Sequence, residues 1–228
     1  MASLPRISFL CLALPLFACA TPAPGPAAPA PELMPGERWS YRQESLYTGR
    51  SLGSFAVAVR EAGREGAVLE LAGDGPAASV SQAPSGMPLQ RWVADGRMLI
   101  HASPGALIRF PLEAGRCWNA RVVLRDLHGG PPVEASVDAC VAGMEKISTP
   151  AGSFDAYVIR RSLYFLERPW WRSEVRLYET DWYAPQAKAV VRTEYDSIFT
   201  DYFRQARGGA EVPGEKVRIE LAARTQEG

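Results

Sequence analysis

From Trp39 onward the chain is a succession of short alternating segments separated by turn residues, and this pattern restricts it to an antiparallel β fold. Runs of strand length with a two-residue period recur, with almost no helical period. The predicted strands are 38–47, 53–61, 66–72, 89–94, 97–102, 107–112, 117–126, 133–147, 154–166, 172–183, 189–198 and 216–223. The sharpest turn signal is Asp95-Gly96, and residues 74–88, which fit neither period, are predicted to be a loop. We therefore expect an all-β antiparallel meander of about 10–12 strands, forming a curved sheet, a half-barrel or a sandwich.

One hairpin can be tested by its register, because Cys117 and Cys140 each lie in a predicted strand. If the two cysteines are directly opposite, the pairs on one face are all apolar. These pairs are Trp118–Ala139, Ala120–Val137, Val122–Ala135 and Leu124–Val133. The other face is mostly polar, with Asn119 opposite Asp138, and a slip of one residue would destroy this sorting. The register predicts a disulfide on the polar face, contributing about 3 kcal/mol. The alternatives are two free buried thiols, or a metal site, for which the chain lacks a CxxC pair and a neighbouring histidine.

The alternation changes phase within 172–183. Val175 and Leu177 have one parity, whereas Tyr178, Thr180 and Trp182 have the other. This change predicts a β-bulge near Leu177-Tyr178.

The same strand carries a carboxylate pair. Glu179 and Asp181 share a face at about 7 Å, a separation that resembles a glycosidase pair. An exposed strand face is the simpler interpretation, because such faces often carry paired charges.

The N-terminus is typical of a secretory signal. Arg6 precedes twelve apolar residues, 7–18, a run too short to span a bilayer. Residues 16–19, Leu-Phe-Ala-Cys, resemble a bacterial lipobox, which predicts cleavage before Cys19 and lipid attachment to its sulfur; Phe17 departs from the small residue usual there. Alternatively, Ala-Cys-Ala at 18–20 is an ordinary cleavage site, which would leave a soluble periplasmic or secreted protein.

A proline-rich segment follows Cys19. Prolines at 22, 24, 26, 29, 31 and 35 favour polyproline II, which could hold a domain up to about 45 Å from a membrane. We therefore predict a signal peptide at 1–18, a lipidated N-terminus and tether at 19–35, and one β domain at 36–228. Two acyl chains give stable attachment, and Ala20 resembles the residues that direct lipoproteins to the outer membrane.

Four stretches together resemble an uncharacterised family of bacterial envelope β domains. They are GERWSYR (36–42), FPLEAGRCW (110–118), EKISTPAGSFDAYVIRR (145–161) and DWYAPQAKAVVRTEY (181–195). The resemblance covers residues 36 to about 222. It implies an antiparallel sheet, with a distant fold-level similarity to lipoprotein-carrier half-barrels, and it brings no known active site. Lys188 stands where the pattern has glycine; if that position needs a positive φ, lysine costs about 1 kcal/mol. We expect Trp39, Trp118 and Trp182 to be core aromatics.

Composition and motifs argue against several functions. Lys plus Arg equals Asp plus Glu at 25 each, so no basic footprint suggests a nucleic-acid partner. His128 lies at a predicted hairpin tip, and His101 with Ser103 is a poor arrangement for nucleophilic catalysis. We therefore expect a protein that is not an enzyme and that uses no metal or cofactor. A hydrolase is the least favoured alternative.

Residues 160–183 are unusually rich in arginine and aromatic side chains. Arg160, Arg161 and Arg176 belong to this segment, and its Pro169 falls where two predicted strands reverse. Interface centres favour these residue types. We predict a partner or ligand surface at Arg168, Trp170, Trp171 and Arg172; the alternative is that the aromatics pack onto the core and the arginines are solvated. The predicted function is a membrane-anchored binding or assembly module that contacts an envelope protein. The alternative is a carrier of a lipid or other hydrophobic ligand.

Overall fold

The structure is a computed structural model that describes residues 25–63, 66–73, 75–82, 91–94, 97–101, 107–126, 129–166, 172–203 and 209–226 of the 228. For 75–82, 91–94, 97–101 and 172–173 it describes the backbone alone. The strands are β1 (Glu37–Ser45), β2 (Ser51–Gly63), β3 (Gly66–Gly73), β4 (Gly75–Gln82), β5 (Arg91–Ala94), β6 (Arg97–His101), β7 (Cys117–Asp126), β8 (Val133–Thr149), β9 (Gly152–Phe165), β10 (Arg172–Ala184), β11 (Ala189–Asp201) and β12 (Ala210–Gln226). A short 3-10 helix, η1 (Pro185–Ala187), joins β10 to β11.

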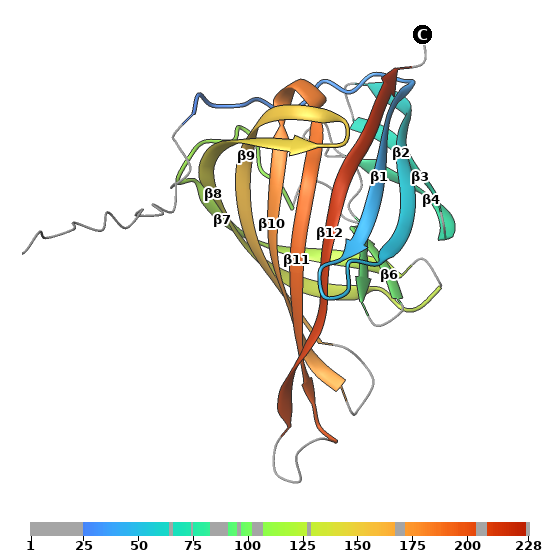
Figure 1. Ribbon diagram of the computed structural model, residues 1–228, viewed down its shortest axis with the longest axis vertical. Coiled ribbons are helices and arrows are strands. Elements are labelled where there is room, and N and C mark those ends of the chain that lie inside the picture. The colour runs from blue at the N-terminus through green and yellow to red at the C-terminus, as the bar shows by residue number, and fades with distance from the viewer. Residues whose placement is uncertain are drawn as a thin grey trace, which may run out of the picture.

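All twelve strands belong to one antiparallel sheet, in the order β4-β3-β2-β1-β12-β11-β10-β9-β8-β7-β6-β5. Chain neighbours are therefore sheet neighbours, except that β1 also pairs with β12 and that β4 and β5 occupy the two edges. Figure 1 shows the sheet curling round on itself. The predicted all-β meander is thus confirmed in its curved, half-barrel form.

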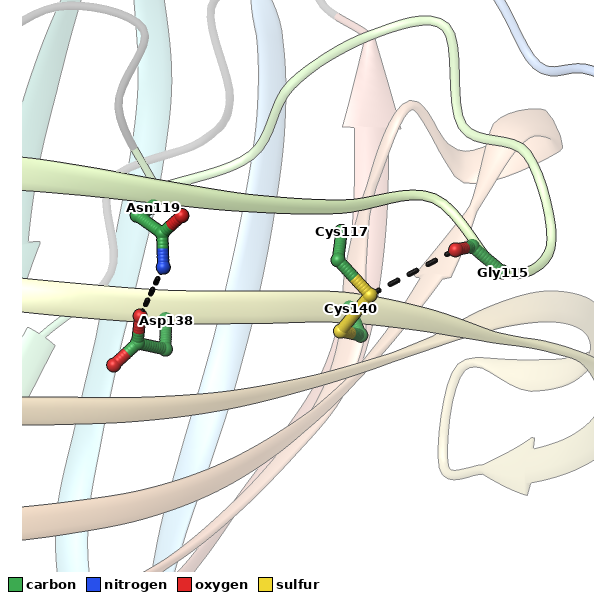
Figure 2. The surroundings of a disulfide bond; sticks show 5 residues. All are labelled: Gly115, Cys117, Asn119, Asp138 and Cys140. Atoms are coloured by element: carbon green, nitrogen blue, oxygen red, sulfur yellow. Dashed lines mark hydrogen bonds between the residues drawn. A yellow bond between two sulfur atoms is a disulfide. The ribbon is translucent and has the colours of Figure 1, made fainter.

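The β7–β8 register is the one predicted from the cysteines. Cys117 pairs with Cys140, and the apolar pairs follow down to Leu124 with Val133. The side chains of Cys117 and Cys140 lie on the exposed face and form a disulfide, with the Asn119 amide donating a hydrogen bond to Asp138 beside it (Figure 2). One alternation pattern was therefore sufficient to fix both faces of this hairpin.

Removing this disulfide should lower the free energy of unfolding by about 3 kcal/mol, because it closes a loop of 23 residues in the unfolded chain. Both cysteines are exposed, so replacing them with alanine removes little packing. Urea unfolding of the Cys117→Ala/Cys140→Ala variant measures the effect, and unreduced and reduced wild-type protein serve as the matched pair. Equal stability of the reduced and unreduced forms would contradict the disulfide.

The core lies on the inner side of the curled sheet, where every second residue of a strand points. On β8 the inward residues run from Val133 to Val141 at alternate positions, and on β9 they include Leu163 and Phe165. The largest fully buried side chains are Trp39, Tyr157, Tyr183, Tyr195 and Phe165. Trp118 is also buried, whereas Trp182 is only partly so. Two of the three tryptophans predicted as core aromatics are therefore fully inside.

Two local predictions were wrong. Residues 75–82 form strand β4 rather than a loop; their sequence is mostly small residues without an apolar period, and the strand lies at an edge of the sheet. Residues 107–112 are not a strand, although Leu107, Ile108 and Leu112 are buried. Pro111 lacks the N–H that a ladder needs, and only Leu112 makes a bridge, with Ala28.

Residues 25–35, which we call the strap, lie against one end of the sheet (blue in Figure 1). Ala28 N–H donates to Leu112 O at 2.9 Å and Leu112 N–H donates to Ala28 O at 2.8 Å. The Tyr157 hydroxyl donates to Pro26 O, and Lys188 Nζ donates to Glu32 O at 2.6 Å. This part of the predicted spacer is therefore packed onto the domain.

Candidate functional site

Two of the stretches that carry the family resemblance contact one another through three inward-facing residues of β1. Glu37 forms an ion pair with Lys188 Nζ at 2.9 Å. Trp39 Nε1 donates to Ala187 O at 2.8 Å, and the Tyr41 hydroxyl donates to Val190 O at 3.1 Å. The start of β1 is thereby joined to the turn between β10 and β11, so these motifs have a shared structural role.

Lys188 adopts the left-handed conformation, with a φ of 53°. The sequence pattern predicted glycine at such a position. Lysine is accommodated because its ammonium group reaches both the Glu37 carboxylate and Glu32 O. These contacts offset the backbone cost of about 1 kcal/mol.

Glu37 is itself buried, and its carboxylate contacts three donor groups. Met34 N–H donates to it at 2.8 Å, and Arg224 Nη2 lies 3.1 Å from its carboxylate, in addition to Lys188. Burial alone would raise the pKa of Glu37, but the bonds from Lys188, Met34 N–H and Arg224 outweigh it and lower the pKa below its ordinary value. Glu37 therefore stays ionised and holds the strap, β12 and the β10–β11 turn together.

Further inside the half-barrel lies a buried charged group that we call the Arg161 cluster: Arg161, Glu179, Asp181 and Thr193. The three charged side chains are fully buried. Arg161 Nη2 lies 2.9 Å from Glu179 Oε1 and also donates to Asp181, while Arg161 Nη1 donates to Leu107 O at 3.1 Å. Thr193 Oγ1 donates to Asp181 Oδ1 at 2.6 Å. One cation thus faces two carboxylates inside the fold.

Ionising both carboxylates in this buried position would cost free energy. Burial raises the pKa of Glu179, Arg161 opposes that shift, and the charge of Asp181 adds to it, so that the pKa of Glu179 rises to about 8. At neutral pH the protonated form of Glu179 is therefore favoured beside Arg161. Burial, and then the charge of Asp181, also raise the pKa of the nearby Tyr41 hydroxyl, which stays protonated.

Stability should fall as the pH rises from about 4.5 towards 8. In this window Glu179 keeps its proton in the folded protein but loses it in the unfolded chain, so unfolding releases a proton and a higher pH favours it. Glu179→Gln, which imitates the protonated carboxyl, should flatten this part of the profile, whereas Glu113→Gln at an exposed position should not. Urea unfolding at a series of pH values measures the slope, and an unchanged slope in Glu179→Gln would contradict the assignment.

The position of the carboxylates corrects two predictions. Glu179 and Asp181 do share a strand face, but that face is the interior rather than an exposed surface. No bulge lies near Leu177-Tyr178, because Val175, Leu177, Glu179, Asp181 and Tyr183 all point inwards in one unbroken alternation. The β10–β11 register shifts instead between Ser173 and Arg176 and between Trp182 and Tyr183.

Arg161 was also predicted to belong to a solvated or partner-facing surface, and it is buried in the cluster instead. The alternation of side chains along β9 could have located Arg161 from the sequence. Arg161 continues the inward series of Ile159, Leu163 and Phe165, and a basic residue in one strand at the depth of two acidic residues in the next indicates a buried pair. Arg160, by contrast, is exposed as predicted.

Most of the residues considered for a lipid, partner or catalytic site lie outside the part of the chain that the structure describes. This holds for Cys19, Arg168, Trp170, Trp171, Ser103 and His128, and only the backbone is described at Arg172 and His101. The neighbouring outer face is described, and Tyr164, Leu166 and Tyr178 are 40%, 59% and 47% exposed there. A groove of about 650 Å³ lies beside Tyr164 and Leu166, and Arg121, Glu134 and Pro131 contribute to its lining.

The side chain of Gln43 is buried on the inner face without a hydrogen bond to the described residues. Gln43 is 2% exposed, and within the described part of the chain neither its Nε2 nor its Oε1 has a hydrogen-bond partner. The neighbouring strand places Gly53 opposite it, so no side chain fills that inward position. A buried amide without a partner is costly, and it marks a place where a polar group of a ligand or a water molecule would be stabilised.

Within the described ranges, no helix is long and apolar enough to cross a membrane. The same residues contain no group of three or more histidine, cysteine or carboxylate side chains that could hold a metal ion.

No family model and no curated protein matches the chain. Among solved structures it is similar to a candidate lipoprotein from Parabacteroides distasonis ATCC 8503, with a TM-score of 0.49 and 16% identity, covering 88% of this chain and 100% of that one. It is also similar to a candidate exported protein with a YmcC-like fold from Bacteroides fragilis NCTC 9343, with a TM-score of 0.47 and 14% identity, covering 88% and 100%. A third is the hypothetical lipoprotein YmcC from Escherichia coli K12, with a TM-score of 0.38 and 11% identity, covering 84% and 85%. None of these three descriptions names an activity or a ligand.

Proposed function

We propose that this chain is an exported bacterial lipoprotein of the cell envelope, anchored through a lipid on Cys19, whose β domain is a non-enzymatic binding or assembly module. The observation that supports the anchor is the disulfide between Cys117 and Cys140. Once the signal peptide is removed, Cys19 is the one cysteine that this disulfide does not include. A disulfide between exposed cysteines also suits an oxidising compartment outside the cytoplasm. Ala20 after the cysteine favours the outer membrane as the final location, with the domain facing the periplasm or the cell surface.

The binding role is supported by the outer face of β8–β10. Exposed Tyr164 and Leu166 line the groove of about 650 Å³. On the neighbouring strand, Arg176 pairs with Tyr164, and exposed Tyr178 is two residues further along the same face. Aromatic side chains with arginine are the usual composition of an interface centre. The segment that carries Arg168, Trp170, Trp171 and Arg172 continues from Leu166, so we assign it to the same partner surface.

A non-enzymatic role is favoured by the burial of the strongest acid–base candidates. Arg161, Glu179 and Asp181 have no solvent-exposed side-chain surface, and a catalytic acid must reach its substrate. The raised pKa of Glu179 is accounted for by burial and by Asp181, and its role is then to stabilise the fold.

The anchor is tested by fractionating cells that express the full chain. Cys19→Ala should move the protein from the membrane fraction to the soluble fraction, because the lipid has no other attachment point. The Cys117→Ala/Cys140→Ala variant, which keeps Cys19, is the matched control and should remain with the membrane. Membrane retention of Cys19→Ala would contradict lipid anchoring at this residue.

A second candidate function is that of a carrier for a lipid or other hydrophobic ligand, and the unsatisfied amide of Gln43 favours it. An amide on the inner face could hold the polar group of a ligand whose apolar part lies among the core side chains. Native mass spectrometry of protein purified without detergent tests this role. A bound species that is lost in Gln43→Leu would support the carrier, and ligand-free protein would exclude it.

A further inference from the structure

We infer that the end of the domain carrying the strap faces the lipid surface of the anchoring membrane and is held within about 20 Å of it. This inference rests on the proposed lipid anchor at Cys19. A fully flexible spacer would leave the domain free to rotate, whereas a spacer that is packed onto the domain fixes which end lies nearest the bilayer.

The strap is fastened along its length. Its first part is held by the two hydrogen bonds between Ala28 and Leu112 and by the Tyr157 hydroxyl on Pro26 O. Its second part is held by Lys188 Nζ on Glu32 O, and Gly36 N–H donates to Val59 O at 3.0 Å where β1 begins. Ala28 is 4% exposed and belongs to the core. The chain is therefore held on the domain from Pro26 onward, and not only from Gly36, where the predicted tether ends.

The length of chain outside the structure then sets the distance. Cys19 precedes Gly25 by six residues. A chain reaches at most about 3.3–3.6 Å per residue, so these six residues span no more than about 20–22 Å. A free spacer up to Pro35 would have reached about 45 Å in polyproline II.

The opposite end of the domain lies far from the end to which the tether is attached. Figure 1 places the strap and the β8–β9 turn at the upper end of the molecule, and the end of β11 and the start of β12 at the lower end. β12 has 17 residues, which corresponds to about 55 Å at 3.3 Å per residue. Exposed Tyr202 and Phe203, next to the lower end of β11, therefore point away from the anchoring bilayer.

The chemistry of the strap end suits a neutral lipid surface. Met34 on the strap is 48% exposed, and the β8–β9 hairpin presents Lys146 and Asp155 together at 3.8 Å. Because the exposed charges there are mixed, the short tether rather than attraction to anionic lipid would hold this end in place.

The test uses the mature chain, residues 19–228, whose only free thiol is Cys19 because Cys117 and Cys140 are joined. A maleimide phospholipid is coupled to Cys19, and the protein is bound to phosphatidylcholine vesicles that carry a headgroup quencher. A dye is introduced through a non-natural amino acid at Asp155 near the strap end or at Glu211 near the far end, two acidic side chains that are 66% and 63% exposed. Quenching should be several-fold stronger at 155, and equal quenching at the two positions would overturn the inference.

A strap variant tests the cause of the orientation. Ala28→Pro removes the N–H that donates to Leu112 O, which should release the strap, lengthen the free tether and reduce the difference between the two dye positions. Ala27→Pro, at an exposed neighbour, is the matched control. Faster hydrogen exchange at the Leu112 N–H reports release; if the strap is released and the difference persists, the strap does not set the orientation. Because the lipid is attached chemically, failure of this test is distinct from failure of the cell to lipidate Cys19.

Discussion

Replacing Arg161 with methionine is expected to lower the free energy of unfolding by about 3–5 kcal/mol. Arg161 is the only cation in the fully buried cluster, and it holds Glu179 at 2.9 Å and Asp181 as well. Methionine fills a similar volume but leaves the Asp181 carboxylate buried with the Thr193 hydroxyl in place of its cation. The cost is therefore that of an uncompensated buried charge rather than of lost packing.

The exposed neighbour Arg160 provides the matched control, since Arg160→Met should change stability by no more than about 0.5 kcal/mol. If Arg161→Met does not fold, Arg161→Met/Asp181→Asn, which removes both charges, should recover most of the loss. Urea unfolding at neutral pH measures all three variants. An Arg161→Met protein as stable as Arg160→Met would show that the charges are not paired as described.

Replacing Trp39 with alanine should lower the free energy of unfolding by about 3–5 kcal/mol. The indole is fully buried at the start of β1, and its Nε1 donates to Ala187 O at 2.8 Å. Alanine would leave a cavity and remove the bond that joins β1 to the β10–β11 turn.

Trp182→Ala is the matched comparison for Trp39→Ala, because Trp182 is only partly buried and its ring lies under Arg192 at 5.8 Å on the sheet. We expect a smaller loss, and thermal unfolding of the two variants compares them. A loss at Trp182 equal to or greater than that at Trp39 would argue against a core role for the first motif.

The hairpin register was predictable because hydrophobicity and pairing agree there. From Trp118 to Leu124 on β7, and from Val133 to Ala139 on β8, each inward position is apolar, so Cys117 and Cys140 fall on the outer face in one register only. The backbone conformation of Lys188 was also predictable, since the family pattern has glycine at this position and Lys188 has a φ of 53°.

Apolar alternation on β9 places Arg161 inside, but it misplaces Glu179 and Asp181, because these two charged side chains occupy inward positions of β10. Because residues 179 and 181 are charged, the sequence pattern predicts that they point outwards. This reverses the apparent alternation within the strand and led to the incorrect prediction of a bulge. These carboxylates are stabilised inside by Arg161 on β9. Arg161 is 18 residues from Glu179 in the sequence, too far for a local sequence pattern to relate them.

The strap and β4 were missed for a related reason. Proline-rich and small-residue segments have little pattern of their own, so their structure is decided by what they pack against. Ala28 is held because it lies between prolines with its own N–H free to bond Leu112, and β4 is held by pairing with β3.

The central claim is that the mature protein begins at a lipidated Cys19, and intact-mass measurement of protein purified from the membrane fraction tests it most directly. The predicted mass is that of residues 19–228 with one disulfide and a diacylglyceryl group on Cys19, and Cys19→Ala should lack that modification. An unmodified chain that begins at Thr21 would contradict the claim.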